Sequence, residues 1–157
     1  MKRLSFTLLL CALVLLARPA VPGTAGMNAP EYDVFWGRLR TTIERHLRRP
    51  YAWGASGLKS FDCSGFVWRV LNDNGVLIKR TTARKYYLSL PPVEKNQEYR
   101  SGNVVFFDNL KHCGIVSNER EFFHARSSAG TTLDNFNFYW DQKVVGFRAI
   151  PVPGISR

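Results

Sequence analysis

Cys63 is the residue whose surroundings most favour reactive chemistry in this chain. It follows Phe61 and Asp62 and precedes Ser64 and Gly65, at the junction of an irregular loop and a predicted helix. Unpaired backbone N–H groups and the positive end of the helix dipole stabilise a thiolate at such a position. Asp62 and Ser64 can cap the same helix. A buried, inert cysteine is the commoner fate of a single thiol, but these polar neighbours favour a nucleophile.

Two histidines supply a candidate base for this thiol. His112 and His124 fall in strand-like segments joined by a turn at residues 117–120. Facing residues in an antiparallel hairpin have a constant sum of residue numbers. A hairpin centred on Asn118 therefore predicts that the two histidines lie directly opposite, with Cβ atoms roughly 5 Å apart. One imidazole can then orient the other, so Cys63 and the two histidines form a predicted nucleophile, base and orienting group.

Other interpretations of these residues stay open. Each histidine could be a hydrogen-bonded polar residue of the sheet. Alternatively, Cys63, His112 and His124 could bind a zinc ion, with water as the fourth ligand. Cys113 is a poor fourth ligand, because neighbouring strand residues point to opposite faces. His46 lies among arginines in the first predicted helix and is expected at the surface.

The elements that must position these residues form an α+β pattern. Residues 31–49 carry apolar residues every four positions, which predicts a helix ending before Pro50. A second helix is predicted from Cys63 or the next residue to Asn74, with Gly75 as its C-terminal cap. Runs rich in β-branched and aromatic residues then predict strands at 103–107, 112–117, 121–125 and 144–150. Helices followed by an antiparallel sheet indicate an α+β domain.

The N-terminal residues predict a secretory signal peptide. A positively charged start precedes an apolar run of 12 residues, Phe6 to Ala17, and small residues follow this run. A membrane anchor is the alternative, but a spanning helix needs roughly 20 apolar residues. We therefore expect cleavage of residues 1–25, a single domain over residues 26–157, and export to the periplasm or medium. No stable membrane insertion is expected after cleavage.

The composition fits one compact domain with a basic surface. The chain has 157 residues, 45% of them apolar, and 22 Lys and Arg against 12 Asp and Glu, a formal net charge of +10. This composition excludes a disordered or collagen-like chain. A basic surface favours anionic partners, such as nucleic acid, a membrane surface or a carboxylate-rich polymer. The predicted export argues against nucleic acid.

Short motifs in this chain follow one another in an order that points to a family. A Tyr-x-Trp-Gly stretch begins at Tyr51, and an Asp-Cys-Ser-Gly helix start contains Cys63. Further motifs occupy residues 80–83, 102–107, 112–116, 122–125 and 145–148. Together, over about residues 32–151, they resemble the NlpC-type family of papain-like cell-wall cysteine peptidases.

The resemblance implies a fold and three principal residues. The fold is a minimal papain-like domain, with N-terminal helices packed on a small antiparallel sheet and the nucleophilic cysteine at a helix N-terminus. Cys63 would be the nucleophile, His112 the general base and acid, and His124 the orienting residue.

The resemblance also implies residues around the substrate. The Tyr51 hydroxyl would help to hold the oxyanion, and Asp62 and Ser64 would shape the substrate cleft. The chain departs from the family pattern at Asn103, Lys85 and Cys113. Cys63 and Cys113 could pair as a disulfide, but the motifs favour one reactive and one buried thiol.

The implied function is hydrolysis of amide bonds in peptidoglycan stem peptides through a Cys-His-His triad. The target would be the D-glutamyl–diamino acid bond or the peptide cross-link. A monomer is expected, with a peptidoglycan or muropeptide substrate and neither a metal nor another cofactor. Two alternatives remain: an amidase or acyltransferase on another amide or a lipid, and a non-enzymatic cationic module that binds the wall.

Overall fold

A computed structural model describes residues 29–151, and the predicted signal peptide lies outside them. The helices are α1 (Ala29–Arg45), α2 (Cys63–Asp73), α3 (Ala83–Ser89), the 3-10 helix η2 (Lys95–Gln97) and α4 (Phe138–Asp141). The strands are β1 (Val104–Phe107), β2 (His112–Asn118), β3 (Glu121–Arg126), β4 (Gly130–Asn135) and β5 (Val144–Arg148). No helix in this part of the chain is long and apolar enough to cross a membrane.

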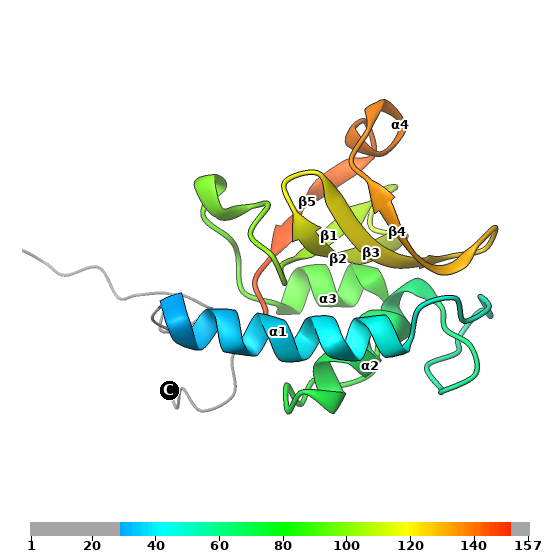
Figure 1. Cartoon of the computed structure of the whole chain (residues 1–157). Coiled ribbons are helices and arrows are strands. Elements are labelled where there is room, and N and C mark those ends of the chain that lie inside the picture. Colours follow the sequence, from blue (N-terminus) through cyan, green and yellow to red (C-terminus); the bar gives the residue numbers. More distant parts are fainter. Residues whose placement is uncertain (1–28, 152–157) are drawn as a thin grey trace, which may run out of the picture.

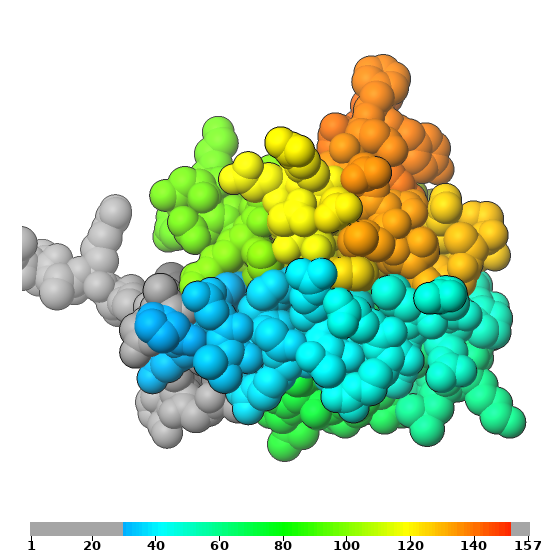
Figure 2. Space-filling view, in the orientation of Figure 1, coloured from blue at the N-terminus to red at the C-terminus, as the bar shows by residue number. Residues whose placement is uncertain are grey.

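The strands form one antiparallel sheet in the order β4-β3-β2-β1-β5, with α1, α2 and α3 beneath it (Figure 1). The predicted α+β fold, with helices packed on a small antiparallel sheet, is confirmed. The sequence patterns predicted two of the helices and four of the strands, but α3, β4 and α4 were missed. Figure 2 shows α4 projecting beyond the sheet, where the Phe138 side chain is exposed.

Helix α1 packs its predicted apolar stripe against the domain. Phe35, Leu39 and Ile43 are buried. The helix ends at Arg45, earlier than the predicted end at residue 49. The backbone N–H of Arg48 instead donates to the Thr131 carbonyl in β4, at 2.8 Å. A tertiary hydrogen bond to the sheet therefore replaces the last predicted helical turn.

The predicted surface position of His46 is wrong. His46 is buried, and its ring packs edge-on against Phe61 with centroids 5.2 Å apart. Its Nε2 lies 3.6 Å from Oδ2 of Asp73, at the C-terminal end of α2. The loop that carries Phe61 folds over the end of α1, so burial of His46 depends on a contact between segments that helical periodicity does not describe.

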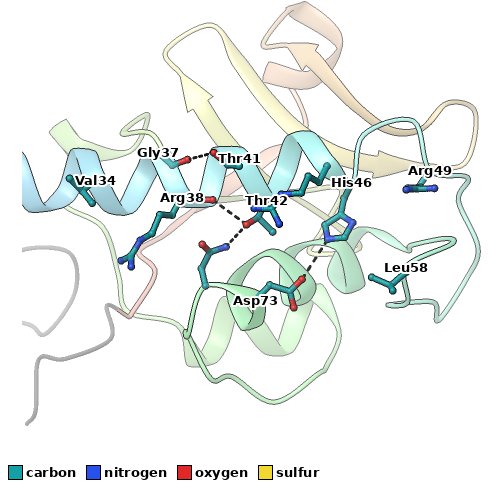
Figure 3. Close-up of a pocket in the computed structure, with 11 residues that line it drawn as sticks. Val34, Gly37, Arg38, Thr41, Thr42, His46, Arg49, Leu58 and Asp73 are labelled. Carbon is teal, nitrogen blue, oxygen red and sulfur yellow. Dashed lines mark hydrogen bonds and ion pairs between the residues drawn. The ribbon is translucent and has the colours of Figure 1, made fainter.

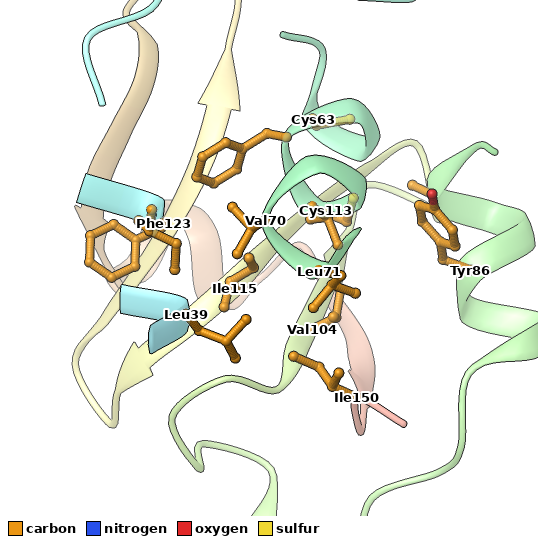
Figure 4. Packing of buried hydrophobic residues seen from close by; sticks show 14 of the residues in the cluster. Leu39, Cys63, Val70, Leu71, Tyr86, Val104, Cys113, Ile115, Phe123 and Ile150 are labelled. Atoms are coloured by element: carbon orange, nitrogen blue, oxygen red, sulfur yellow. The ribbon is translucent and has the colours of Figure 1, made fainter. Parts of the chain in front are cut away.

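Both faces of the sheet are covered, so β1 is buried along its whole length. The face toward the helices carries Val104, Ile115 and Phe123, which pack with Leu39, Val70 and Leu71 (Figure 4). The opposite face carries a second apolar cluster, composed of Val105, Phe107, Val116, Phe122, Trp140 and Phe147. This second cluster packs against the two histidines.

The register of the β2–β3 hairpin differs from the predicted one. Gly114, not His112, lies opposite His124. Asn118 pairs with Glu121, so the turn lies at residues 119–120 and not at Asn118, and the shift between Val116 and Asn118 only partly offsets this difference. His112 and His124 still share a face, because the shift is two residues and strand side chains alternate with a period of two. The histidines are therefore diagonal neighbours, not directly opposed.

We predict that two glycine substitutions have opposite effects on stability. A Cβ at Gly65 in α2 would lie 2.1 Å from the Ala55 carbonyl oxygen, so Gly65→Ala forces the loop off the helix. We expect a loss of about 2 kcal/mol or more in the free energy of unfolding. Gly37 in α1 has open space around its Cα, so Gly37→Ala should stabilise by about 0.5–1 kcal/mol. Urea denaturation measures both, and equal stability of the two variants would contradict this packing.

Candidate active site

Cys63 is the first residue of α2, as predicted. Asp62 is the N-cap of this helix, and its carboxylate accepts a hydrogen bond from the Gly65 N–H at 2.6 Å. The thiol is nearly buried, with 7% of the residue exposed, and lies 3.8 Å from the Lys111 carbonyl oxygen. The first N–H groups of a helix have no acceptor within the helix. The thiol therefore sits among backbone dipoles that favour a negative charge.

Asp62 and Ser64 form a buried network with Arg80. The Arg80 guanidinium donates to Asp62 Oδ2 at 2.6 Å and to Ser64 Oγ at 2.9 Å. The Ser64 hydroxyl donates to Asp62 Oδ1 at 3.0 Å. Asp62 Oδ2 also accepts from the Gly54 N–H at 2.9 Å. These two predicted cleft residues therefore lie behind the thiol, where they hold the helix start and the preceding loop.

Cys113 lies beside Cys63, and both thiols are free. The hydrogen bond from Cys113 lowers the pKa of Cys63, burial opposes this effect, and His112 lowers the pKa further, so that it is about 5. Burial and the adjacent Cys63 raise the pKa of Cys113 well above its usual value. The Cys63 thiol therefore ionises readily, whereas the Cys113 thiol keeps its proton.

His112 and His124 are in direct contact despite their diagonal register. Nε2 of His112 lies 2.7 Å from Nδ1 of His124. Across the hairpin from His124, Gly114 leaves the necessary space, because a Cβ there would lie 3.1 Å from the His124 Cβ and 2.6 Å from the Phe123 carbonyl oxygen. His124 is fully buried. Burial first, and then His112, lower the pKa of His124, so this ring is neutral.

Two residues that the sequence did not identify complete the surroundings of the histidines. Trp140 of α4 stacks on His112, with centroids 5.5 Å apart and an interplanar angle of 22°. Asp134 of β4 places Oδ2 3.2 Å from Nε2 of His124. The alternating Thr-Leu-Asp-Asn run after residues 127–130 could have indicated a strand carrying Asp134. Trp140 has no comparable signal, because only tertiary packing brings α4 to the sheet.

Tyr51 lies close to Cys63, in a loop held by backbone hydrogen bonds. The Ala52 N–H donates to the Phe61 carbonyl at 3.1 Å, and the Asp62 N–H donates to the Ala55 carbonyl at 2.8 Å. Burial first, and then the nearby Cys63 and Asp62, raise the pKa of Tyr51. Its phenol therefore keeps its proton at neutral pH and can act as a hydrogen-bond donor.

A cleft of about 510 Å³ opens beside His112. Its lining combines basic, acidic, hydroxyl and aromatic side chains. The lining residues are Tyr51, Asp108, Asn109, Lys111, His112, Ala125, Arg126, Ser127, Ser128, Tyr139 and Trp140. His112 and Tyr51 line this cleft, and the ionisable thiol of Cys63 lies close to both, an arrangement that suits nucleophilic attack on a carbonyl group.

Among residues 29–151, no group of three His, Cys, Asp or Glu side chains is arranged to hold a metal ion. The alternative of a Cys63, His112 and His124 zinc site does not fit the histidine geometry. The facing nitrogens of the two rings are 2.7 Å apart and engage each other in a hydrogen bond.

We predict that Cys63 reacts with iodoacetamide at unusually low pH. A thiolate forms above its pKa, so the alkylation rate should rise with a midpoint near pH 5. Cys113→Val keeps a buried apolar side chain but removes the S–H donor, so the midpoint should move to higher pH. Peptide mass spectrometry after timed alkylation measures the rate at residue 63. Cys63→Ala is the control for reaction at Cys113, and an equal midpoint in wild type and Cys113→Val would contradict this account of the thiol.

Comparison with known proteins identifies the family of this chain. The profile of the NlpC/P60 family matches residues 48–149. The chain is 33% identical over 108 residues to the probable endopeptidase p60 of Listeria seeligeri, covering 66% of this chain and 20% of that protein. It is 31% identical over 98 residues to the murein DD-endopeptidase MepS/murein LD-carboxypeptidase of Escherichia coli, covering 59% of this chain and 51% of that protein.

Solved structures show the same fold. An NLP/P60-family protein of Staphylococcus aureus, described as similar to lipoprotein, matches with a TM-score of 0.68 at 22% identity, over 76% of this chain and 42% of that one. The peptidoglycan hydrolase RipB of Mycobacterium tuberculosis matches with a TM-score of 0.66 at 16% identity, over 82% and 71%. The chain spans about a fifth of the length of the first p60 relatives. The matched profile covers most of the described residues, and the chain belongs to the NlpC/P60 family.

Proposed function

We propose that the protein is an exported cysteine peptidase that hydrolyses amide bonds in peptidoglycan stem peptides. The observation that carries the proposal is the Cys63 thiol at the start of α2, beside His112, whose Nε2 is held 2.7 Å from His124. Membership of the NlpC/P60 family supports it. Relatives named endopeptidase p60 and murein DD-endopeptidase support the peptidoglycan substrate.

In the first half of the reaction, His112 takes the proton of Cys63 and the thiolate attacks the scissile carbonyl carbon. A C–S bond forms, and the carbonyl oxygen becomes an oxyanion. Tyr51 and the backbone N–H of Cys63 donate hydrogen bonds to this oxyanion, where a donor fixed in advance has its largest effect. His112 then protonates the leaving nitrogen as the C–N bond breaks.

In the second half, water hydrolyses the thioester. His112 removes a proton from the water, the C–S bond breaks, and the thiol recovers its proton. His124 orients His112 throughout through their hydrogen bond. Asp62 and Ser64 contribute through the Arg80 network, which fixes the loop and helix on the acyl side of the cleft.

The charge of the cleft suits a substrate rich in carboxylates. Lys111 and Arg126 line it together with one carboxylate, Asp108, and residues 26–157 contain 19 Lys and Arg (22 − 3) against 12 Asp and Glu. Stem peptides carry free carboxylates on D-glutamate and diamino acid residues. Either the D-glutamyl–diamino acid bond or the peptide cross-link would therefore meet complementary charge. Residues 1–25 would act as the signal peptide, residues 26–157 as a single domain, and the site of action would be the periplasm or the cell exterior.

The test is incubation of purified peptidoglycan fragments with the mature protein, followed by mass spectrometry. We expect new amine and carboxyl ends with wild type, which also identify the bond. Cys63→Ala should lose roughly 10³-fold or more in rate, because the neighbouring thiol, Cys113, is fully buried and keeps its proton. Circular dichroism checks that the variant is folded.

Two outcomes would contradict the proposal. Cleavage by folded Cys63→Ala would exclude Cys63 as the nucleophile. Unchanged fragments with a wild-type protein whose Cys63 is alkylated at low pH would exclude peptidoglycan as the substrate. That second result would favour an amidase or acyltransferase that acts on another amide or a lipid.

A further inference from the structure

Asp134 continues the chain of polar side chains that begins at Cys63. In the β3–β4 pairing, Asp134 faces Phe122 and Thr132 faces His124, so Asp134 reaches His124 along a diagonal. Its Oδ2 lies 3.2 Å from Nε2 of His124. This nitrogen is buried and makes no hydrogen bond of normal geometry within the described part of the chain, so Asp134 is within hydrogen-bonding distance but is not aligned with it. A buried ring N–H needs an acceptor, and the Asp134 carboxylate is in position to be that acceptor.

The hydrogen-bonding capacity of each group then determines which ring nitrogens of His112 and His124 carry a proton. An ionised carboxylate only accepts, so His124 must carry its single proton on Nε2. Nδ1 of His124 is then an acceptor, and His112 must donate to it from Nε2. The remaining nitrogen of His112, Nδ1, is left to take the proton of Cys63. In the opposite tautomer, Nδ1 of His124 would donate to Nε2 of His112, and His112 would carry its own proton on Nδ1, where it could not accept the proton of Cys63.

We propose that Asp134 is a positioning residue that holds His124 in its Nε2–H tautomer and thereby directs the basic nitrogen of His112 toward Cys63. This inference rests on the proposed function and extends the predicted Cys-His-His triad by a carboxylate that the motifs did not identify. Asp134 does not touch the reacting atoms. It acts through His124, on the sheet face that also carries Trp140.

The charged groups around these side chains agree with the proposed proton positions. Arg126 Nε lies 3.5 Å from Asp134 Oδ2, so a guanidinium group also contacts this carboxylate. His124 is neutral, because its burial outweighs the attraction of Asp134 and lowers its pKa. The groups that face Cys63 are His112, Cys113, Tyr51 and Asp62. None of these four supplies an alternative acceptor to Nε2 of His124.

The first measurement reads the tautomer directly in wild-type protein. Long-range ¹H–¹⁵N NMR correlations of labelled histidine side chains distinguish protonated from unprotonated ring nitrogens. We expect His124 to be protonated on Nε2 and unprotonated on Nδ1 at neutral pH. A spectrum with the proton on Nδ1 would overturn the proposal without recourse to any variant.

The second measurement compares Asp134→Ala and Asp134→Asn with a matched control. Loss of the carboxylate weakens the thiolate–imidazolium pair, so the midpoint of Cys63 alkylation should rise by roughly one pH unit. Cleavage of peptidoglycan at pH 6 should fall about tenfold or more. A merely structural role would lower stability without moving the midpoint. An unchanged midpoint in both folded variants would therefore overturn the proposal.

The control is Asp73→Asn, which alters a second histidine–aspartate pair outside the cleft. Asp73 Oδ2 lies 3.6 Å from His46 Nε2 in a separate groove of about 710 Å³ between α1 and the end of α2 (Figure 3). This variant should leave the alkylation midpoint and cleavage unchanged, and a shift equal to that of the Asp134 variants would overturn the proposal. If wild type shows the expected tautomer and midpoint but leaves peptidoglycan intact, the proposed substrate is wrong while the role of Asp134 stands.

Discussion

The buried carboxylate of Asp62 is the constraint on which the rest of this site depends. It caps α2, bonds the Gly54 N–H of the preceding loop and pairs with Arg80, from the segment that leads to α3. A carboxylate in such a place is stable only because each oxygen is hydrogen-bonded and a guanidinium balances the charge. Three chain segments thus meet at one side chain, and Cys63 is the next residue.

The thiol lies beside the start of β2, where it is close to side chains from both faces of the sheet. Cys63 and Cys113 belong to the apolar cluster on the helix side, while His124 packs against Phe122 and Trp140 of the opposite cluster. Burial alone would keep Cys63 protonated. The hydrogen bonds of Cys113 and His112 reverse that tendency and bring its pKa to about 5. Apolar surroundings and an ionisable thiol therefore coexist because specific donors outweigh desolvation.

Local patterns predicted the parts of this site that depend on neighbours along the chain. The start of α2 at Cys63 followed from its capping residues, and the shared face of His112 and His124 followed from strand alternation. The register did not follow, because Asn118 pairs with Glu121 and the turn closes at residues 119–120, a position that the local pattern does not determine. The roles of the predicted residues remain proposals, while the fold and family are established.

The parts that escaped prediction all depend on long-range packing. Asp134 meets His124 only after two strand registers are set, and Trp140 needs α4 to fold over the sheet. His46 is buried because a distant loop places Phe61 on it. The periodicity of the local sequence does not predict any of these contacts.

Gly114 contributes no side-chain atoms, yet the geometry of the histidines depends on it. It occupies the place opposite His124, where even one added carbon would press on the Phe123 carbonyl and the His124 Cβ. The vacancy lets His112 cross the hairpin diagonally, which a filled position would block. A space of about one methyl group is thus part of the site, and a larger residue at position 114 would meet the β3 backbone whatever reaction the site carries out.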